Sequence, residues 1–204
     1  MLNKHLRTTL HAVARFYDQR KVGDGGSLGF RRSSDLAKVV ACLEPLIQRN
    51  ILMPQKSLFL DLGCADGRVN VLLSYLVKKS IGIELDEWTL DEYVPLKTGL
   101  EATLMESDLA FPPDNIFLFN GDSLDDVLHE AIDEQTGVSF GEFDLFYTYL
   151  TMYEEFAELV GRKAKKGAVF MVYGLERILP KFNGLHLLTP ERPIEDTLTL
   201  YKKR

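Results

Sequence analysis

Acidic residues cluster at positions where their side chains can hold a ligand. These residues are Asp61, Asp66, Glu84, Asp86 and Asp122. Asp61 and Asp66 flank the glycine turn in the stretch LDLGCADG, at residues 60–67. A carboxylate accepts hydrogen bonds from amino and hydroxyl groups, and glycine lets the backbone approach a bound molecule closely. The pattern indicates a site for a cationic ligand that also carries hydroxyl or amino groups.

Apolar stretches alternate with helical patterns along most of the chain, and they place these acids at the ends of strands. Strands are predicted at residues 57–63, 80–86, 115–122, 142–150 and 167–175. Helical spacing of apolar residues predicts helices near 6–17, 36–47, 68–79, 87–106 (broken or kinked near Pro95), 124–132 and 152–166. Two alternating stretches, 185–191 and 196–203, are typical of a hairpin pair.

Strands that alternate with helices are typical of βαβ units and a parallel sheet. We therefore expect an α/β, Rossmann-like fold with a seven-stranded, mostly parallel sheet, helices on both faces and an antiparallel edge strand. Four glycines between Gly23 and Gly29 interrupt the N-terminal helical pattern. Residues 1–30 are accordingly predicted to form a helical appendage or lid, and residues 31–204 the main domain.

The first loop is poorly suited to a phosphate. It lacks the G-x-G-x-x-G pattern of dinucleotide sites, and Asp66 would repel a phosphate. Glu84 follows the loop by about 20 residues, the spacing of a carboxylate that binds ribose hydroxyls. Asp122 can accept a hydrogen bond from an exocyclic amine such as that of adenine. A structural turn with acids as helix caps is the alternative, but the joint pattern favours a cationic nucleoside, S-adenosyl-L-methionine.

The same residues carry a family resemblance. The stretch FLDLGCADGRV resembles motif I of the class I S-adenosylmethionine-dependent methyltransferases, and IGIELDEW, FNGDS and FDLFYTYL fall where later motifs of that superfamily lie. Ala65 stands where many members have a third glycine. A narrower similarity connects the first two stretches with the DOT1-like and FAM173-type protein-lysine methyltransferases.

The resemblance and the chemistry together imply a cofactor site. Its expected residues are Asp61, Gly63, Cys64, Ala65, Asp66, Gly67, Glu84, Leu85, Asp122 and Ser123. Asp61 and Asp66 would hold the amino end of the cofactor, the glycine turn would approach its methionine part, and Glu84 would hold the ribose. Leu85 would pack on the adenine or ribose, and Asp122 with Ser123 would meet the adenine.

The acceptor side of the site is less well marked. Tyr147 and Tyr149, in the fourth strand, are catalytic candidates that could wall an acceptor pocket; a place in the strand core is the alternative. The Asn/Asp-Pro-Pro-Tyr/Phe signature of base amino-group methylation is absent. The four histidines show no ligand spacing, so no metal site is expected.

Charge narrows the choice of partner. The formal net charge is -6, although residues 1–38 carry eight Lys/Arg against three Asp. Nucleic acid is therefore an unlikely partner, and no apolar run is long enough for a membrane helix. We expect a cytoplasmic methyltransferase that acts on a protein side chain such as lysine or on a small molecule. The alternative is a non-catalytic S-adenosylmethionine-binding module that acts through a protein partner.

Overall fold

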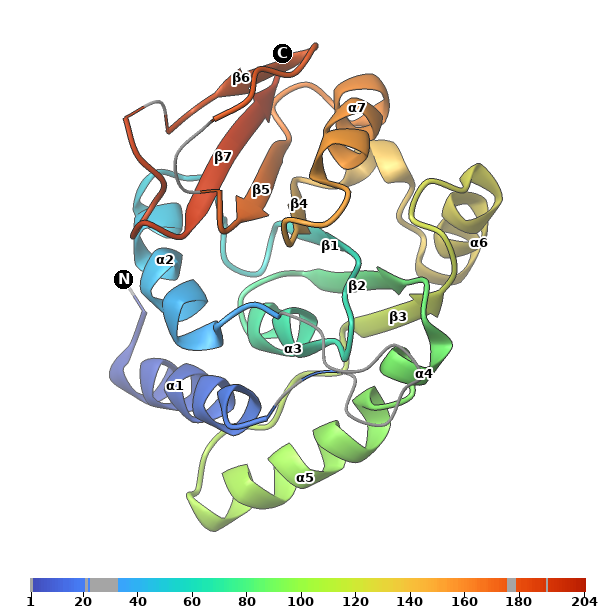
Figure 1. The fold of residues 1–204 in the computed structure, drawn as a ribbon. Coiled ribbons are helices and arrows are strands. Elements are labelled where there is room, and N and C mark those ends of the chain that lie inside the picture. The colour runs from blue at the N-terminus through green and yellow to red at the C-terminus, as the bar shows by residue number, and fades with distance from the viewer. Residues whose placement is uncertain (1, 21, 23–32, 176–178, 190) are drawn as a thin grey trace.

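The computed structural model describes residues 2–20, 22, 33–175, 179–189 and 191–204. In this part of the chain seven strands form one sheet, in the order β3-β2-β1-β4-β5-β7-β6 (Figure 1). The strands are β1 (Leu58–Leu62), β2 (Lys79–Glu84), β3 (Ile116–Asn120), β4 (Leu145–Thr148), β5 (Val169–Tyr173), β6 (Leu185–Leu187) and β7 (Leu198–Lys203). The order reverses between β1 and β4, which makes that place the switch point of the sheet.

The sheet confirms the predicted Rossmann-like α/β fold. Strands β1 to β5 pair with one another in parallel, whereas β7 is antiparallel to both β5 and β6. The one reversed strand therefore lies next to the edge strand β6, and the two form the predicted hairpin pair. A short connection between β6 and β7 permits antiparallel pairing, because a parallel crossover needs a dozen or more residues.

Helices cover both faces of the sheet, as predicted (Figure 1). They are α1 (Lys4–Asp18), α2 (Leu36–Gln48), α3 (Arg68–Ser74), α4 (Glu87–Leu90), α5 (Tyr93–Glu106), α6 (Asp126–Thr136) and α7 (Tyr153–Lys163), with a 3-10 turn η1 (Phe140–Glu142). Alternate strand residues point to opposite faces. Phe59 and Leu145 thus pack in one cluster with α1, α2, α3 and α5, and Leu60 and Phe146 pack in another with α6 and α7.

Helix α1 is built into the first of these clusters. Leu10, Val13 and Tyr17 are buried there with residues of the sheet, α2 and α3. Asp35 caps α2 by accepting a hydrogen bond from the backbone N–H of Lys38, at the predicted start. The predicted boundary between residues 1–30 and 31–204 lies in residues 23–32, which are outside the described residues.

One predicted helix ends early, and the predicted break in another is confirmed. Helix α3 stops at Ser74 instead of residue 79. The side-chain amide of Asn115 donates to the carbonyl of Ser74, the last helical residue, and to that of Val77 beyond it. Lys79 already belongs to β2. The predicted helix at 87–106 is divided into α4 and α5, with Pro95 in the first turn of α5, where its missing N–H costs no helical hydrogen bond.

Candidate functional site

The glycine turn after β1 rests on the end of β2. The backbone N–H groups of Gly63 and Cys64 both donate to the carbonyl of Ile83, at 2.9 and 2.8 Å. Gly63 has φ +91° and no atom within 4 Å of the place a Cβ would occupy. Gly67 also has a positive φ, +73°, and starts α3. The turn therefore presents open backbone to a ligand at the carboxyl end of β1.

Asp61 lies beneath this turn and is 1% exposed. Among the described residues six buried side-chain atoms lack a hydrogen-bond partner, and the Oδ1 atom of Asp61 is the one carboxylate oxygen in that set. Burial, together with the nearby carboxylates of Glu84 and Asp66, raises the pKa of Asp61 well above its ordinary value. A buried polar atom without a partner is rare in proteins, and a cationic hydrogen-bond donor from a ligand would satisfy this one.

Glu84 ends β2 and is held in place by the backbone. Its two carboxylate oxygens accept hydrogen bonds from the N–H of Ala65, at 2.9 Å, and of Asp86, at 3.0 Å. Ala65 itself has φ +51°, which is uncommon for a residue other than glycine. Glu84 thus connects the glycine turn with the loop after β2.

Cys64 and Asp66 are buried inside the turn. The thiol of Cys64 packs against Gly82, where an added Cβ would lie 2.8 Å from the sulfur. Burial and the carboxylates of Asp61, Glu84 and Asp66 raise the pKa of Cys64, so its thiol stays protonated and is a packing group. Both carboxylate oxygens of Asp66 accept hydrogen bonds from the guanidinium of Arg68.

The loop after β3 brings the other predicted residues to the same edge of the sheet. The N–H of Gly121 donates to the carbonyl of Glu84 and joins the two loops. Asp122 is exposed and accepts a hydrogen bond from the N–H of Leu124, whereas Ser123 is buried. Leu85, like Trp88, exposes 70% of its surface next to this loop.

The two predicted tyrosines, one in β4 and one just after it, occupy different environments. Tyr147 is 2% exposed, its hydroxyl lies 2.5 Å from the Oγ of Ser34, and burial raises its pKa. Tyr149 is half-buried just beyond β4 and stacks on Tyr173, with ring centroids 5.4 Å apart. Tyr149 is thus the more accessible of the two at the strand end.

Sequence reasoning missed Arg68, and it missed the contact between Ser34 and Tyr147. Arg68 is buried and contacts Asp66, and Ser34 contacts Tyr147 from a segment 113 residues away in the chain. The position of Arg68 two residues after Asp66 was the only local feature of the sequence that could have predicted their pairing. No local sign exists for Ser34, because its partner comes from the sheet.

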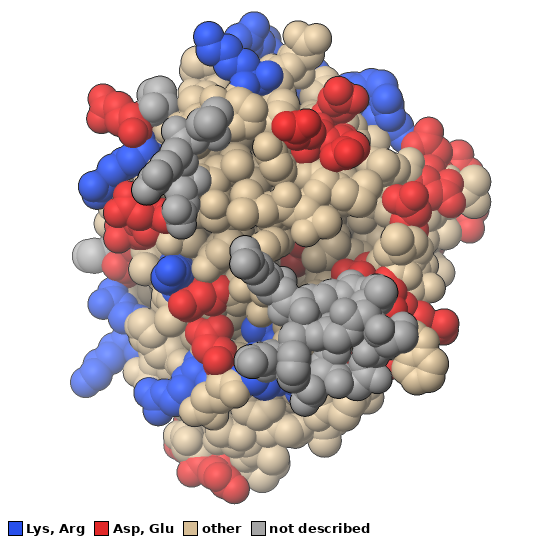
Figure 2. Space-filling model, in the orientation of Figure 1, with Lys and Arg blue, Asp and Glu red and all other residues tan. Residues whose placement is uncertain are grey.

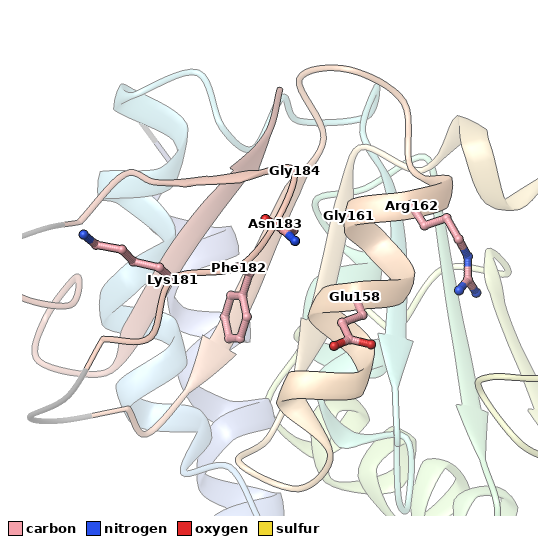
Figure 3. Close-up of a pocket in the computed structure, with 7 residues that line it drawn as sticks. All are labelled: Glu158, Gly161, Arg162, Lys181, Phe182, Asn183 and Gly184. Carbon is pink, nitrogen blue, oxygen red and sulfur yellow. The ribbon is translucent and has the colours of Figure 1, made fainter.

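A pocket that shares no residue with this site lies between α7 and the turn before β6. It has a volume of about 530 Å³ and is lined by Glu158, Gly161, Arg162, Lys181, Phe182, Asn183 and Gly184. The side chains of Arg162 and Lys181 extend away from each other, on opposite sides of it (Figure 3). They do not converge on a common ligand.

The described residues also bear on metal binding and on membrane insertion. Within the described residues no group of three His, Cys, Asp or Glu side chains is arranged to hold a metal ion. None of the described helices is long and apolar enough to cross a membrane.

Comparison with known proteins identifies the fold. No protein-family model and no curated protein matches the sequence. Among solved structures, an RNA methyltransferase from Salinibacter ruber in complex with S-adenosyl-L-homocysteine is similar, with a TM-score of 0.50 and 12% identity over 85% of this chain and 93% of that one. A candidate methyltransferase from Escherichia coli, yhhF, has a TM-score of 0.52 and 14% identity over 80% and 84%. The chain therefore has the fold of the class I methyltransferases. The narrower likeness to protein-lysine enzymes stays a prediction.

Proposed function

We propose that the protein is an S-adenosyl-L-methionine-dependent methyltransferase. The observation that carries this proposal is the buried carboxyl group of Asp61. Its Oδ1 has no hydrogen-bond partner in the described part of the chain, and it lies near the open backbone of Gly63. The amino group of the cofactor would satisfy that oxygen. The carboxylate of Glu84, which lies near enough to raise the pKa of Asp61, would also favour the positive sulfonium.

The remaining cofactor contacts follow from the two adjacent loops. Glu84 would accept hydrogen bonds from the ribose hydroxyls, because its carboxylate is already oriented by two backbone N–H groups. Asp122 and Ser123 would meet the adenine, and the exposed Leu85 would cover one face of it. An apolar side chain at 70% exposure gains burial when a planar base packs on it.

The acceptor would be a cationic or neutral group rather than a nucleic acid. Three segments that follow β2, β3 and β4, residues 85–92, 121–127 and 149–156, contain nine acids and no Lys or Arg. Two of these acids are paired with basic residues elsewhere in the chain, Glu92 with Arg20 and Asp126 with Lys163. Acidic side chains gather over α6 and α7 in Figure 2. Such a surface repels a phosphate backbone and attracts a basic partner. A protein side chain such as lysine and a cationic small molecule both fit this charge pattern.

Methyl transfer needs alignment more than it needs a reactive side chain. A bound cofactor would supply an electrophilic methyl group on sulfur. The lone pair of a deprotonated acceptor would attack it in line, and the electron pair of the broken carbon–sulfur bond would leave with sulfur. An ammonium group would first have to lose its proton to water. The chain would hold the donor through Asp61 and Glu84 and present the acceptor beside Tyr149. The buried hydroxyl of Tyr147 is hydrogen-bonded to Ser34, and we assign Tyr147 a supporting role in shaping the acceptor pocket beside Tyr149.

A binding titration tests the proposal. Calorimetry with S-adenosyl-L-homocysteine should give one site in the tens of micromolar or tighter, and Glu84→Ala should abolish or strongly weaken it. Glu134→Ala, an exposed acid on α6, is the matched control and should bind like the wild type. Absence of wild-type binding, or unchanged affinity in Glu84→Ala, refutes the assignment.

Radiolabelled methyl transfer into a fractionated cell extract identifies the class of acceptor. Label in protein or in small molecules, lost in Glu84→Ala, is the expected result. Label in nucleic acid would contradict the charge argument. Cofactor binding with no transfer to any fraction would favour the non-catalytic binding module.

A further inference from the structure

One buried ion pair lies inside the glycine turn. Asp66 is fully buried and Arg68 is 3% exposed. The Nε and Nη2 atoms of Arg68 donate to Oδ1 and Oδ2 of Asp66, both at 2.9 Å. Two parallel hydrogen bonds fix the direction of the guanidinium as well as its position. Gly67 lies between the two residues, and its positive φ allows the turn into α3 that brings their side chains together.

The same guanidinium reaches two other parts of the chain. Its Nη1 atom donates to the Oγ of Ser33, at 3.0 Å, just before α2. Its central carbon lies 5.6 Å from the ring centroid of Tyr17, in the last turn of α1. A cation over an aromatic face is an attractive arrangement. Arg68 is therefore a junction between the turn, α1 and the segment that leads into α2.

Stability alone is a weak explanation for this pair. A buried ion pair is often no more stabilising than well-packed apolar side chains of the same size. A bidentate pair fixes the orientation of both side chains, and the turn at residues 63–67 contains a backbone conformation that has to be held in place. Ala65 is held at φ +51°, a conformation that persists only where the surroundings enforce it. Glu84 fixes Ala65 from one side through its N–H, and Asp66 follows on the other side.

We propose that Arg68 is a positioning residue, which fixes Asp66 and thereby holds the turn at residues 63–67 in the conformation that receives the methionine end of the cofactor. Its contacts with Ser33 and Tyr17 tie that conformation to the two N-terminal helices. Asp66 then serves the cofactor through the shape of the turn, because both of its oxygens are engaged by Arg68. This inference rests on the proposed function.

Arg68→Lys is the first test, since lysine keeps the charge and loses the planar fork. Calorimetry with S-adenosyl-L-homocysteine gives the dissociation constant and the number of sites, and scanning calorimetry gives the melting temperature. We expect the dissociation constant to rise at least tenfold with the number of sites unchanged. Arg7→Lys is the matched control, because Arg7 bonds a carboxylate, Glu44, on the exposed face of α1. It should bind like the wild type.

A purely structural role gives a different result. It would lower the melting temperature and the fraction of binding-competent protein, and it would leave the dissociation constant of the folded fraction unchanged. Asp66→Asn, which keeps the side-chain size, provides a second variant if Arg68→Lys does not fold, and it too should weaken binding. Wild-type affinity in either folded variant overturns the inference alone. A wild-type protein that binds no S-adenosyl-L-homocysteine overturns the proposed function and this inference with it.

Discussion

Replacing Asp61 by Asn should weaken cofactor binding and stabilise the free protein at the same time. The carboxyl group is buried, its Oδ1 has no partner, and the carboxylates of Glu84 and Asp66 lie near it. A hydrogen bond between a buried charged group and its partner contributes about 1.5–3 kcal/mol. Loss of such a bond to the cofactor amino group should raise the dissociation constant about 10- to 150-fold.

The stability effect has the opposite sign. The pKa of Asp61 is raised in the folded protein, so the folded state favours the protonated form. Below about pH 3.9, the pKa of an aspartate in the unfolded chain, Asp61 is protonated in both states and costs the fold nothing. As the pH rises through the higher pKa of Asp61 in the folded protein, the free energy of unfolding decreases. Asn cannot ionise. Asp61→Asn should therefore unfold at a higher temperature than the wild type at pH 7, and the difference should vanish near pH 4 and below.

Isothermal titration with S-adenosyl-L-homocysteine and thermal unfolding over a pH series measure the two effects. Asp144→Asn is the matched control at the other end of the sheet, where Asp144 pairs with Lys165 at 2.6 Å and accepts a hydrogen bond from the N–H of Leu58. It should lower stability and leave affinity unchanged. If Asp61→Asn lowers the melting temperature and binds the ligand normally, Asp61 is a structural residue and the electrostatic reasoning is wrong.

Three further substitutions test the packing around the sheet. Gly161→Ala should destabilise the protein by about 1–3 kcal/mol in chemical denaturation, because the new Cβ would lie 2.6 Å from the carbonyl oxygen of Asn183. Gly99→Ala, also at a helical glycine, should instead raise stability by up to about 1 kcal/mol, since its Cβ meets no atom closer than 3.4 Å. Tyr147→Phe should lower the free energy of unfolding by about 1 kcal/mol, because the hydroxyl of Ser34 loses its partner at 2.5 Å. The labelled-methyl assay should show unchanged turnover per folded molecule. A hundredfold loss of turnover would make Tyr147 a catalytic residue.

The fold was predictable because parallel strands buried on both faces leave continuous apolar runs in the sequence. The proximity of the glycine turn and Glu84 was predictable for a related reason: the carboxyl ends of neighbouring parallel strands lie at the same edge of the sheet. The end of α3 was not predictable, because the amide of Asn115, about 40 positions later, caps its carbonyls. The pairing of Arg68 with Ser33 likewise joins residues 35 positions apart. Contacts of this kind leave no periodic or local pattern.

Backbone conformation marks the same edge of the sheet independently of charge. Among the described residues other than glycine, those with positive φ are Asn50, Gln55, Ala65, Asp108, Met152, Glu195 and Asp196. Ala65 and Met152 alone in this set are apolar, and both follow the adjacent central strands β1 and β4. Strained residues persist where the surrounding structure enforces them and are frequent at functional sites. Because the strand order reverses between β1 and β4, these two turns face the crevice where open α/β sheets bind their ligands. The turn at Ala65 would then receive the methyl donor, and the turn at Met152, which is 41% exposed, would meet the acceptor.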